Sequence, residues 1–133
     1  MAEAGGCHCG SVSYELREGA APVHHALCHC ADCRKFSGAP AVAWTLFAKE
    51  DVTVRGEPAR YRSSEHAERY FCATCGSSLF YTNDQIFPGQ IDIQSATLDR
   101  PDAFPLQAQI QTADRIGWME NLDGLPQFER YPS

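Results

Sequence analysis

The chain has 133 residues, of which 44% are hydrophobic and 21% charged, and its formal net charge is −6. This length and composition predict a single globular domain over residues 1–133 with a core of its own. The acidic balance argues against a nucleic-acid-binding protein, because such binding depends on clustered Lys and Arg. Small molecules or protein surfaces are therefore the expected partners, and the sequence carries no signal for an oligomeric state.

The sequence shows no segment that would place the protein in or across a membrane. No run of about 18 apolar residues occurs, which is the length that a helical span needs. The first residues, "MAEAGGCHCG", lack the basic start and the apolar run of a secretory signal. We therefore expect no membrane partner and a cytoplasmic location, where thiols stay reduced.

The predicted elements, taken in chain order, are mostly short strands separated by Gly, Pro, Ser, Asn or Asp. Apolar and polar residues alternate in Ser11–Leu16, which is typical of a half-buried strand. The longer apolar run Ala39–Phe47 favours a central strand. Five further strands are expected, at Asp51–Gly56, Ala59–Ser64, Ala67–Cys72, Ser78–Thr82 and Gly89–Ser95. The predicted fold class is therefore mainly β, with many short antiparallel strands.

Helical structure is expected in two short stretches, Ala31–Ser37 and Phe47–Asp51. Trp44, Phe47 and Trp118 are expected in the core. The tail after Trp118 carries two prolines, and we expect it to drape over the domain as irregular chain. Because short strands each bury little apolar surface, metal sites would help to hold such a fold together.

The cysteines are the most informative residues of the chain. Seven is an odd number, and in a reducing compartment it points to metal binding or catalysis before disulfides. They fall into three clusters, Cys7-x-Cys9, Cys28-x-Cys30-x-x-Cys33 and Cys72-x-x-Cys75.

The first and third clusters together supply the four thiolates of a closed structural zinc site. Each pair is followed by a glycine, Gly10 or Gly76, which lets the main chain turn sharply around a metal. The predicted structural ligands are Cys7, Cys9, Cys72 and Cys75.

The middle cluster then keeps three thiols, Cys28, Cys30 and Cys33. A zinc ion held by three thiolates has an open tetrahedral position, which is typical of a catalytic site. Arg34 and Lys35 follow directly and could present positive charge to an anionic substrate; the alternative is an ordinary solvated face.

Other interpretations of the cysteines stay open. They are buried free thiols, disulfides, a thioredoxin-like redox pair, an iron–sulfur cluster, and a second closed zinc site. In the last case a histidine would complete the triad, and the candidates are His24, His25, His29 and His66. His24 and His25 precede the triad on a further expected strand, and only one of them can face it. His8 and His29 each stand in the middle of a Cys-x-Cys pair, so their side chains should point away from the metal. For each histidine, a surface or hydrogen-bonded core position is the competing expectation.

Four segments resemble the glutathione-dependent formaldehyde-activating enzyme family, which includes the centromere protein V type of domain. They are "GGCHCGSVSYEL", "CHCADCRKFSGAP", "FCATCGSSLFY" and "DGLPQFERYP", and they extend from Gly5 to Pro132. The resemblance implies a β-tent fold of small antiparallel sheets with short helical turns, stabilised by zinc. It also implies two Zn²⁺ ions, with the structural and catalytic ligands divided as the spacing predicts.

By this resemblance the chain would be a carbon–sulfur lyase acting on S-(hydroxymethyl)glutathione or a similar thiol–aldehyde adduct. Its partner would then be a small-molecule thiol such as glutathione. The alternatives are a non-catalytic zinc-binding interaction module, like the centromere relatives, and a zinc-buffering or redox-responsive thiol protein. Family members often carry a histidine where this chain has Gln109, which predicts an altered substrate or weaker turnover if that histidine serves the site.

Overall fold

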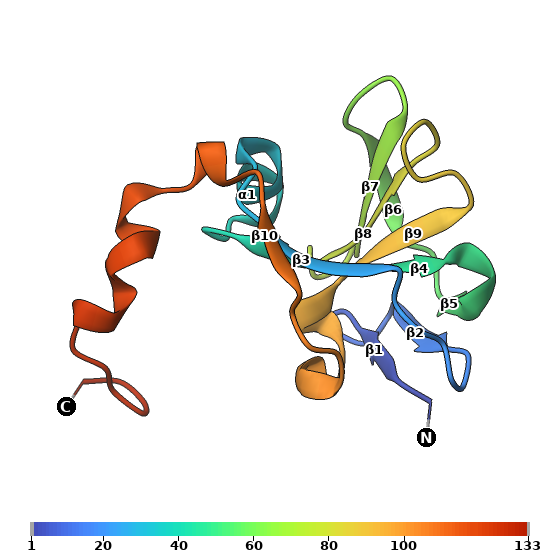
Figure 1. Cartoon of the computed structure of the whole chain (residues 1–133). Coiled ribbons are helices and arrows are strands. Elements are labelled where there is room, and N and C mark those ends of the chain that lie inside the picture. Colours follow the sequence, from blue (N-terminus) through green and yellow to red (C-terminus); the bar gives the residue numbers. More distant parts are fainter. Residues whose placement is uncertain (1, 133) are drawn as a thin grey trace.

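The computed structural model describes residues 2–132, and two β-sheets dominate it (Figure 1). The small sheet has the strand order β1 (Ala4–Gly6), β2 (Ser13–Leu16), β5 (Val52–Arg55). The large sheet has the order β10 (Ala108–Ile110), β3 (His24–Cys28), β4 (Val42–Ala48), β9 (Gln90–Gln94), β8 (Ser78–Asn83), β7 (Ala67–Phe71), β6 (Ala59–Arg62). The prediction of a mainly β fold is confirmed.

The helices are short, as the sequence predicts. Helix α1 covers Ala31–Ser37 and ends at Gly38, which has a φ of 72° and donates its N–H to the carbonyl oxygen of Arg34. The expected second helix shrinks to a 3₁₀ turn, Lys49–Asp51, because Phe47 lies within β4. Further 3₁₀ helices cover Ser95–Thr97, Pro101–Ala103, Thr112–Asp114 and Gly117–Gly124.

Two strands, β1 and β10, have no counterpart in the sequence prediction. Both have three residues, and neither "AGG" nor "AQI" alternates polar with apolar side chains over a useful length. They join the sheets through main-chain pairing with β2 and β3. The β10–β3 pair is parallel, with Ile110 opposite Cys28, which departs from the all-antiparallel expectation.

The main core lies between the two sheets. Phe47, Leu79 and Ile93 from the large sheet are 0% exposed. Tyr14 of the small sheet packs edge-on against Phe80, with 5.4 Å between the ring centroids. Burial of these apolar side chains fixes which face of the large sheet is turned inward, and so leaves its other face for the site described below.

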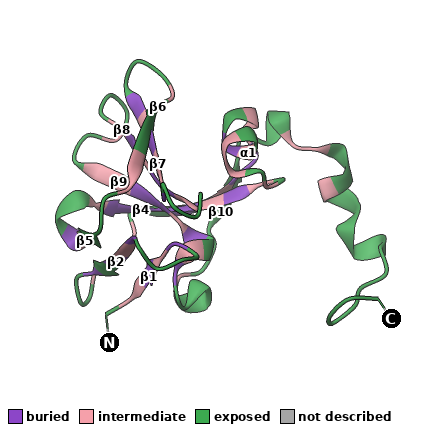
Figure 2. Ribbon diagram, turned by 180° about the vertical axis from the view of Figure 1, so that it is seen from behind, coloured by how far each residue is buried: buried purple, intermediate pink, exposed green. Residues whose placement is uncertain are grey.

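The tail does not drape over the body of the molecule, contrary to expectation. After Trp118 it extends away from both sheets, and in Figure 2 it is exposed almost throughout. Its main-chain hydrogen bonds are local, such as Leu125 N–H to the Leu122 carbonyl, and none of those within the described residues reaches the sheets. Trp118 is 57% exposed and was wrongly expected in the core, whereas Trp44 and Phe47 are confirmed there at 7% and 0%.

None of the helices in residues 2–132 has the length and hydropathy of a membrane span. The single domain over residues 1–133 stays a prediction.

Candidate metal centres and the cavity over the cysteine triad

The first and third cysteine clusters meet in space. The four Sγ atoms of Cys7, Cys9, Cys72 and Cys75 lie within 4.8 Å of one another. Cys9 Sγ is 3.7 Å from Cys7 Sγ and 3.8 Å from Cys72 Sγ. A tetrahedral zinc with Zn–S bonds of about 2.3 Å separates its sulfurs by about 3.8 Å, so this donor set fits zinc.

The two glycines of this cluster act as the sequence predicts. Gly10 and Gly76 have φ angles of 84° and 80°, in the left-handed region that favours glycine. Gly76 donates its N–H to the carbonyl oxygen of Cys72 at 2.8 Å, which closes a tight turn between the two cysteines of the pair. The turn brings the Sγ atoms of Cys72 and Cys75 within 4.8 Å of each other, so that both can bind one metal ion.

Main-chain N–H groups surround the sulfurs of this four-cysteine cluster. Cys72 Sγ accepts from the N–H groups of Thr74 and Cys75, both at 3.4 Å, and Cys7 Sγ accepts from Val12 at 3.3 Å. The hydrogen bond from the Cys75 N–H lowers the pKa of Cys72 to about 7. Hydrogen bonds from Ser77 lower the pKa of Cys75 to about 5. The thiolate form that a metal requires is therefore favoured at these two cysteines.

The middle cluster forms a separate group, the cysteine triad of Cys28, Cys30 and Cys33, whose Sγ atoms also lie within 4.8 Å of one another. Cys28 ends β3, Cys30 precedes α1, and Cys33 lies in its first turn. Cys28 Sγ and Cys33 Sγ are 3.8 Å apart, the same spacing as in the four-cysteine cluster. This donor set also fits zinc, with three protein ligands instead of four.

No histidine within residues 2–132 belongs to either group of sulfurs. His25 is hydrogen-bonded through both ring nitrogens, to Pro105 O at 3.1 Å and to Ser95 Oγ at 2.9 Å. His29 is buried and its Nε2 bonds Gln109 Oε1 at 2.9 Å. All seven cysteines are free thiols, so the disulfide interpretation finds no support either.

A cavity of about 550 Å³ opens over the triad. Its floor is the face of the large sheet that is turned away from the main core. Cross-strand neighbours form one row on this face, which runs across β7, β8, β9, β4 and β3. The row consists of Arg69, Tyr81, Asp92, Leu46 and His24, all of which line the cavity. Trp44 and Ala26, in the next row on the same face, complete the floor.

Arg69 connects this floor to the triad. It is 6% exposed, and its two terminal nitrogens donate to Cys33 Sγ at 3.7 and 3.8 Å. The guanidinium carbon lies 4.9 Å from the ring centroid of Tyr81 and 5.5 Å from that of Phe36, which are cation–π distances. A hydrogen bond from Cys28 and the charge of Arg69 lower the pKa of Cys33 to about 5, while the same hydrogen bond raises the pKa of Cys28.

Asp92 is the second buried charged residue of the floor. It is 8% exposed and sits on β9, the middle strand of the large sheet. Burial raises the pKa of its carboxyl group to about 7, and the negative charge of Cys33 adds to the effect.

Arg34 and Lys35 do not line the cavity of the triad. They border a separate hollow of about 350 Å³ together with Ile116 and Trp118. Their predicted part in substrate binding stays a prediction. Gln109 also lies outside the cavity lining, and its Oε1 accepts from Arg115 at 3.3 Å as well as bonding His29.

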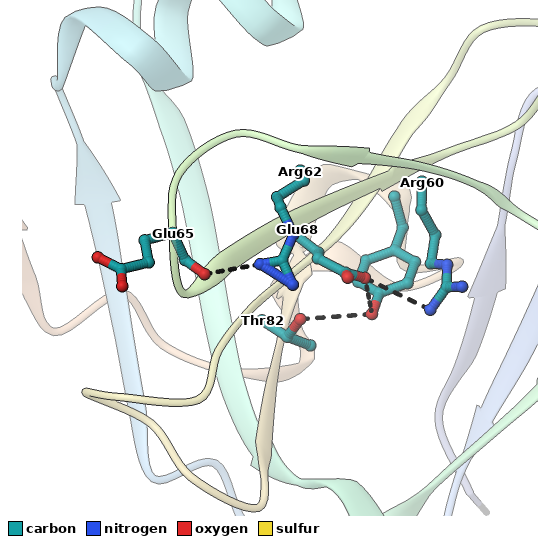
Figure 3. A network of polar contacts seen from close by, with 6 residues as sticks. Arg60, Arg62, Glu65, Glu68 and Thr82 are labelled. Carbon is teal, nitrogen blue, oxygen red and sulfur yellow. Dashed lines mark hydrogen bonds and ion pairs between the residues drawn. The ribbon is translucent and has the colours of Figure 1, made fainter.

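The reverse face of β7 carries a polar hollow of about 370 Å³, whose network is drawn in Figure 3. Glu68 Oε2 accepts from Tyr70 Oη at 3.2 Å and from Arg60 at 3.5 Å, and Arg62 donates to the carbonyl oxygen of Glu65 at 2.7 Å. These charges are partly exposed and bonded to one another. The cavity over the triad, with its buried charges and grouped thiols, is therefore the better candidate site.

Sequence reasoning missed Arg69 and Asp92. One signal was available for each: Arg69 occupies the same strand parity as buried Ala67, and Asp92 stands between two isoleucines of a central strand. A charge in such a position is exceptional unless it serves a site.

A model of one protein family, described as "Glutathione-dependent formaldehyde-activating enzyme", matches residues 2–114. An uncharacterized lyase of Schizosaccharomyces pombe is 33% identical in an alignment of 91 positions, which covers 58% of this chain and 66%, just under two thirds, of that protein. A Halomonas elongata protein that carries the name of the same family is 28% identical in an alignment of 130 positions, which covers 87% of this chain and 78% of that protein.

Among solved structures, a crystal structure of a Rhodobacter sphaeroides protein matches with a TM-score of 0.61 and 24% identity. The match covers 80% of this chain and 98% of that one. At this identity the likeness shows a common fold.

Proposed function

The chain belongs to the glutathione-dependent formaldehyde-activating enzyme family, and from this premise we propose that it is a carbon–sulfur lyase for S-(hydroxymethyl)glutathione or a similar thiol–aldehyde adduct. In the synthetic direction the thiol sulfur forms a bond to the carbonyl carbon of formaldehyde. The thiol proton passes to the carbonyl oxygen, which becomes the hydroxyl group. The lyase direction reverses both changes, and neither direction needs an oxidant or a reductant.

The observation that carries this proposal is the placement of the triad. Cys28, Cys30 and Cys33 line a cavity of about 550 Å³, whereas none of the four cysteines of the other cluster lines it. A tetrahedral zinc held by three thiolates keeps one position for a substrate, and here that position would face the cavity. The four-cysteine cluster would hold a closed structural zinc.

The chemistry that zinc supplies when bound at the triad is stabilisation of a substrate thiolate or polarisation of an aldehyde oxygen. The chain's own residues would prepare the site for this chemistry. Arg69 offsets the negative charge of the three thiolates, and its stacking on Tyr81 and Phe36 holds the guanidinium in place. Trp44 and Leu46 give the floor apolar surface that limits the access of water.

We keep Arg34 and Lys35 as secondary candidates for steering an anionic substrate from the neighbouring hollow. Their charges lie near the surface, so their expected contribution is to the rate of association rather than to the chemical step.

The test is the rate of adduct formation between glutathione and formaldehyde, measured by NMR exchange spectroscopy above the uncatalysed background. For Cys30→Ser we expect the enzymatic rate to fall by at least about 100-fold, because one of three thiolates at the open site is lost. Glu65→Gln, a change at a side chain that is 88% exposed and outside the cavity lining, is the control and should keep the rate. Full activity of Cys30→Ser would refute the proposal and leave a zinc-binding interaction module as the better interpretation.

A further inference from the structure

Asp92 is a largely buried carboxylate that has no hydrogen-bond or ion-pair partner among residues 2–132. It lines the cavity over the triad and is 8% exposed. Within residues 2–132 no hydrogen-bond donor and no cationic side chain contacts its oxygens. Burial of a carboxylate without a partner is costly, and proteins keep such groups mainly where they have a task.

The two basic side chains in the same row of the floor do not fill this need. Arg69 lies on β7 and His24 on β3, and each is two strands away from Asp92, with Tyr81 or Leu46 between them. Two strand spacings amount to about 9.6 Å between main chains. Arg69 already directs both terminal nitrogens at Cys33 Sγ, and His24 is exposed at the mouth of the cavity.

The balance of charges in the cavity also indicates that Asp92 needs a partner. The positive charge of Arg69 is engaged by the triad, so the charge of Asp92 is left without compensation. A substrate that brings its sulfur to the triad as a thiolate adds further negative charge. A substrate that also carries a cation would compensate Asp92 and relieve the cost of its burial.

We propose that Asp92 binds the protonated amino group of the substrate, so that the cavity selects thiols that carry an amine. The γ-glutamyl amino group of glutathione is one such group. The proposal rests on the proposed function for the position of the substrate sulfur, and it adds the chemical class that the site selects.

The experiment compares two ligands that differ at the amine. Glutathione and N-acetylglutathione are titrated calorimetrically into the zinc-loaded protein, without formaldehyde, at about pH 8, above the pKa of about 7 of the Asp92 carboxyl group. A charge-assisted hydrogen bond to a buried carboxylate predicts that glutathione binds at least about 10-fold more tightly. In Asp92→Asn, which keeps the shape of the side chain, we expect this ratio to approach one through weaker binding of glutathione alone.

Asp84→Asn is the matched control. It removes the same formal charge from an exposed position at the polar hollow, outside the lining of the triad cavity. Its binding ratio should equal that of the wild type, since long-range electrostatics at the surface is screened by salt. A loss of discrimination in this variant too would show that net charge decides, and would overturn the role of Asp92.

Equal affinity of the wild type for the two ligands would overturn the proposal without any variant. A lower turnover number of Asp92→Asn with an unchanged binding ratio would do the same and assign Asp92 to proton transfer instead. The test separates this inference from the proposed function. Amine-selective binding without adduct formation would refute the lyase and keep Asp92 as the recognition residue. Adduct formation with equal efficiency for both thiols would refute the recognition role and keep the lyase.

Discussion

The two cysteine clusters have the same ligand atoms at the same spacing and quite different surroundings. In the four-cysteine cluster the sulfurs lie on loops, with Cys9 and Cys75 exposed, and main-chain N–H groups and serine hydroxyls contact them. In the triad the sulfurs lie where β3 meets α1, and a buried guanidinium contacts one of them. The cavity of about 550 Å³ is lined by the three cysteines of the triad and by none of the four cysteines of the other cluster.

Under the proposed function, the difference teaches that the surroundings, more than the ligands, would separate a structural site from a reactive one. Fixed main-chain dipoles stabilise thiolates and leave no position for another molecule. The triad has three sulfurs instead of four, the buried guanidinium of Arg69 as a charge partner, and a cavity with room for a substrate. Each of the following changes should affect one cluster and spare the other.

The largest effect on stability is expected for Cys72→Ser. Cys72 is 1% exposed and belongs to both the four-cysteine cluster and the main core. Loss of a structural metal should lower the free energy of unfolding by at least about 3 kcal/mol, which urea denaturation would detect. If this variant unfolded at the same urea concentration as the wild type, the four-cysteine cluster would have no structural role.

A smaller effect, on metal binding at the triad alone, is expected for Arg69→Met. The change keeps a long side chain between Phe36 and Tyr81 but removes the positive charge that faces Cys33. Zinc affinity at the triad should fall by about 10-fold, as is typical for loss of a residue that supports a ligand. Competition with a chromogenic chelator would measure it as an earlier release of one zinc.

Arg60→Met is the control for this change. Arg60 pairs with Glu68 at 3.5 Å on the reverse face of the sheet, and its side chain is 66% exposed. Loss of Arg60 should leave the release of both zinc ions to the chelator unchanged. If Arg69→Met released zinc just as the wild type does, the charge at the triad would have no part in holding metal.

The smallest effect is expected for Ser77→Ala at the four-cysteine cluster. Ser77 Oγ accepts from the N–H of His8 at 3.0 Å and contacts Cys75 Sγ at 3.2 Å. Loss of these contacts should lower the free energy of unfolding by about 1 kcal/mol. Turnover per folded molecule should stay the same, and a drop in turnover would show that the two clusters are coupled.

The sequence predicted what depends on local spacing. The grouping of the cysteines follows from two tight turns and one strand–helix junction, each a few residues long, and the structure brings the sulfurs together as expected. Helix α1 and most strands of the large sheet were predicted for the same reason, because alternation and turn residues are read over short windows.

What the sequence could not supply depends on pairing between distant segments. Arg69 and Asp92 become neighbours of the triad only through the register of β7, β8 and β9, and a one-residue shift would turn both to the other face. Strand β10 forms because a late segment returns beside β3, for which the three residues of β10 carry no pattern. The tail was wrongly expected to lie over the domain: its apolar residues Trp118, Leu122, Leu125 and Phe128 are 43% to 59% exposed.

The central claim is that the chain holds two separate zinc sites, one closed by four cysteines and one open with three. Elemental analysis of the wild type and of Cys28→Ser tests it most directly, because Cys28 belongs to the triad alone. The account predicts about two zinc ions per wild-type chain and about one in the variant, with circular dichroism unchanged. One zinc per chain in both proteins, or loss of all zinc together with the fold in the variant, would contradict it.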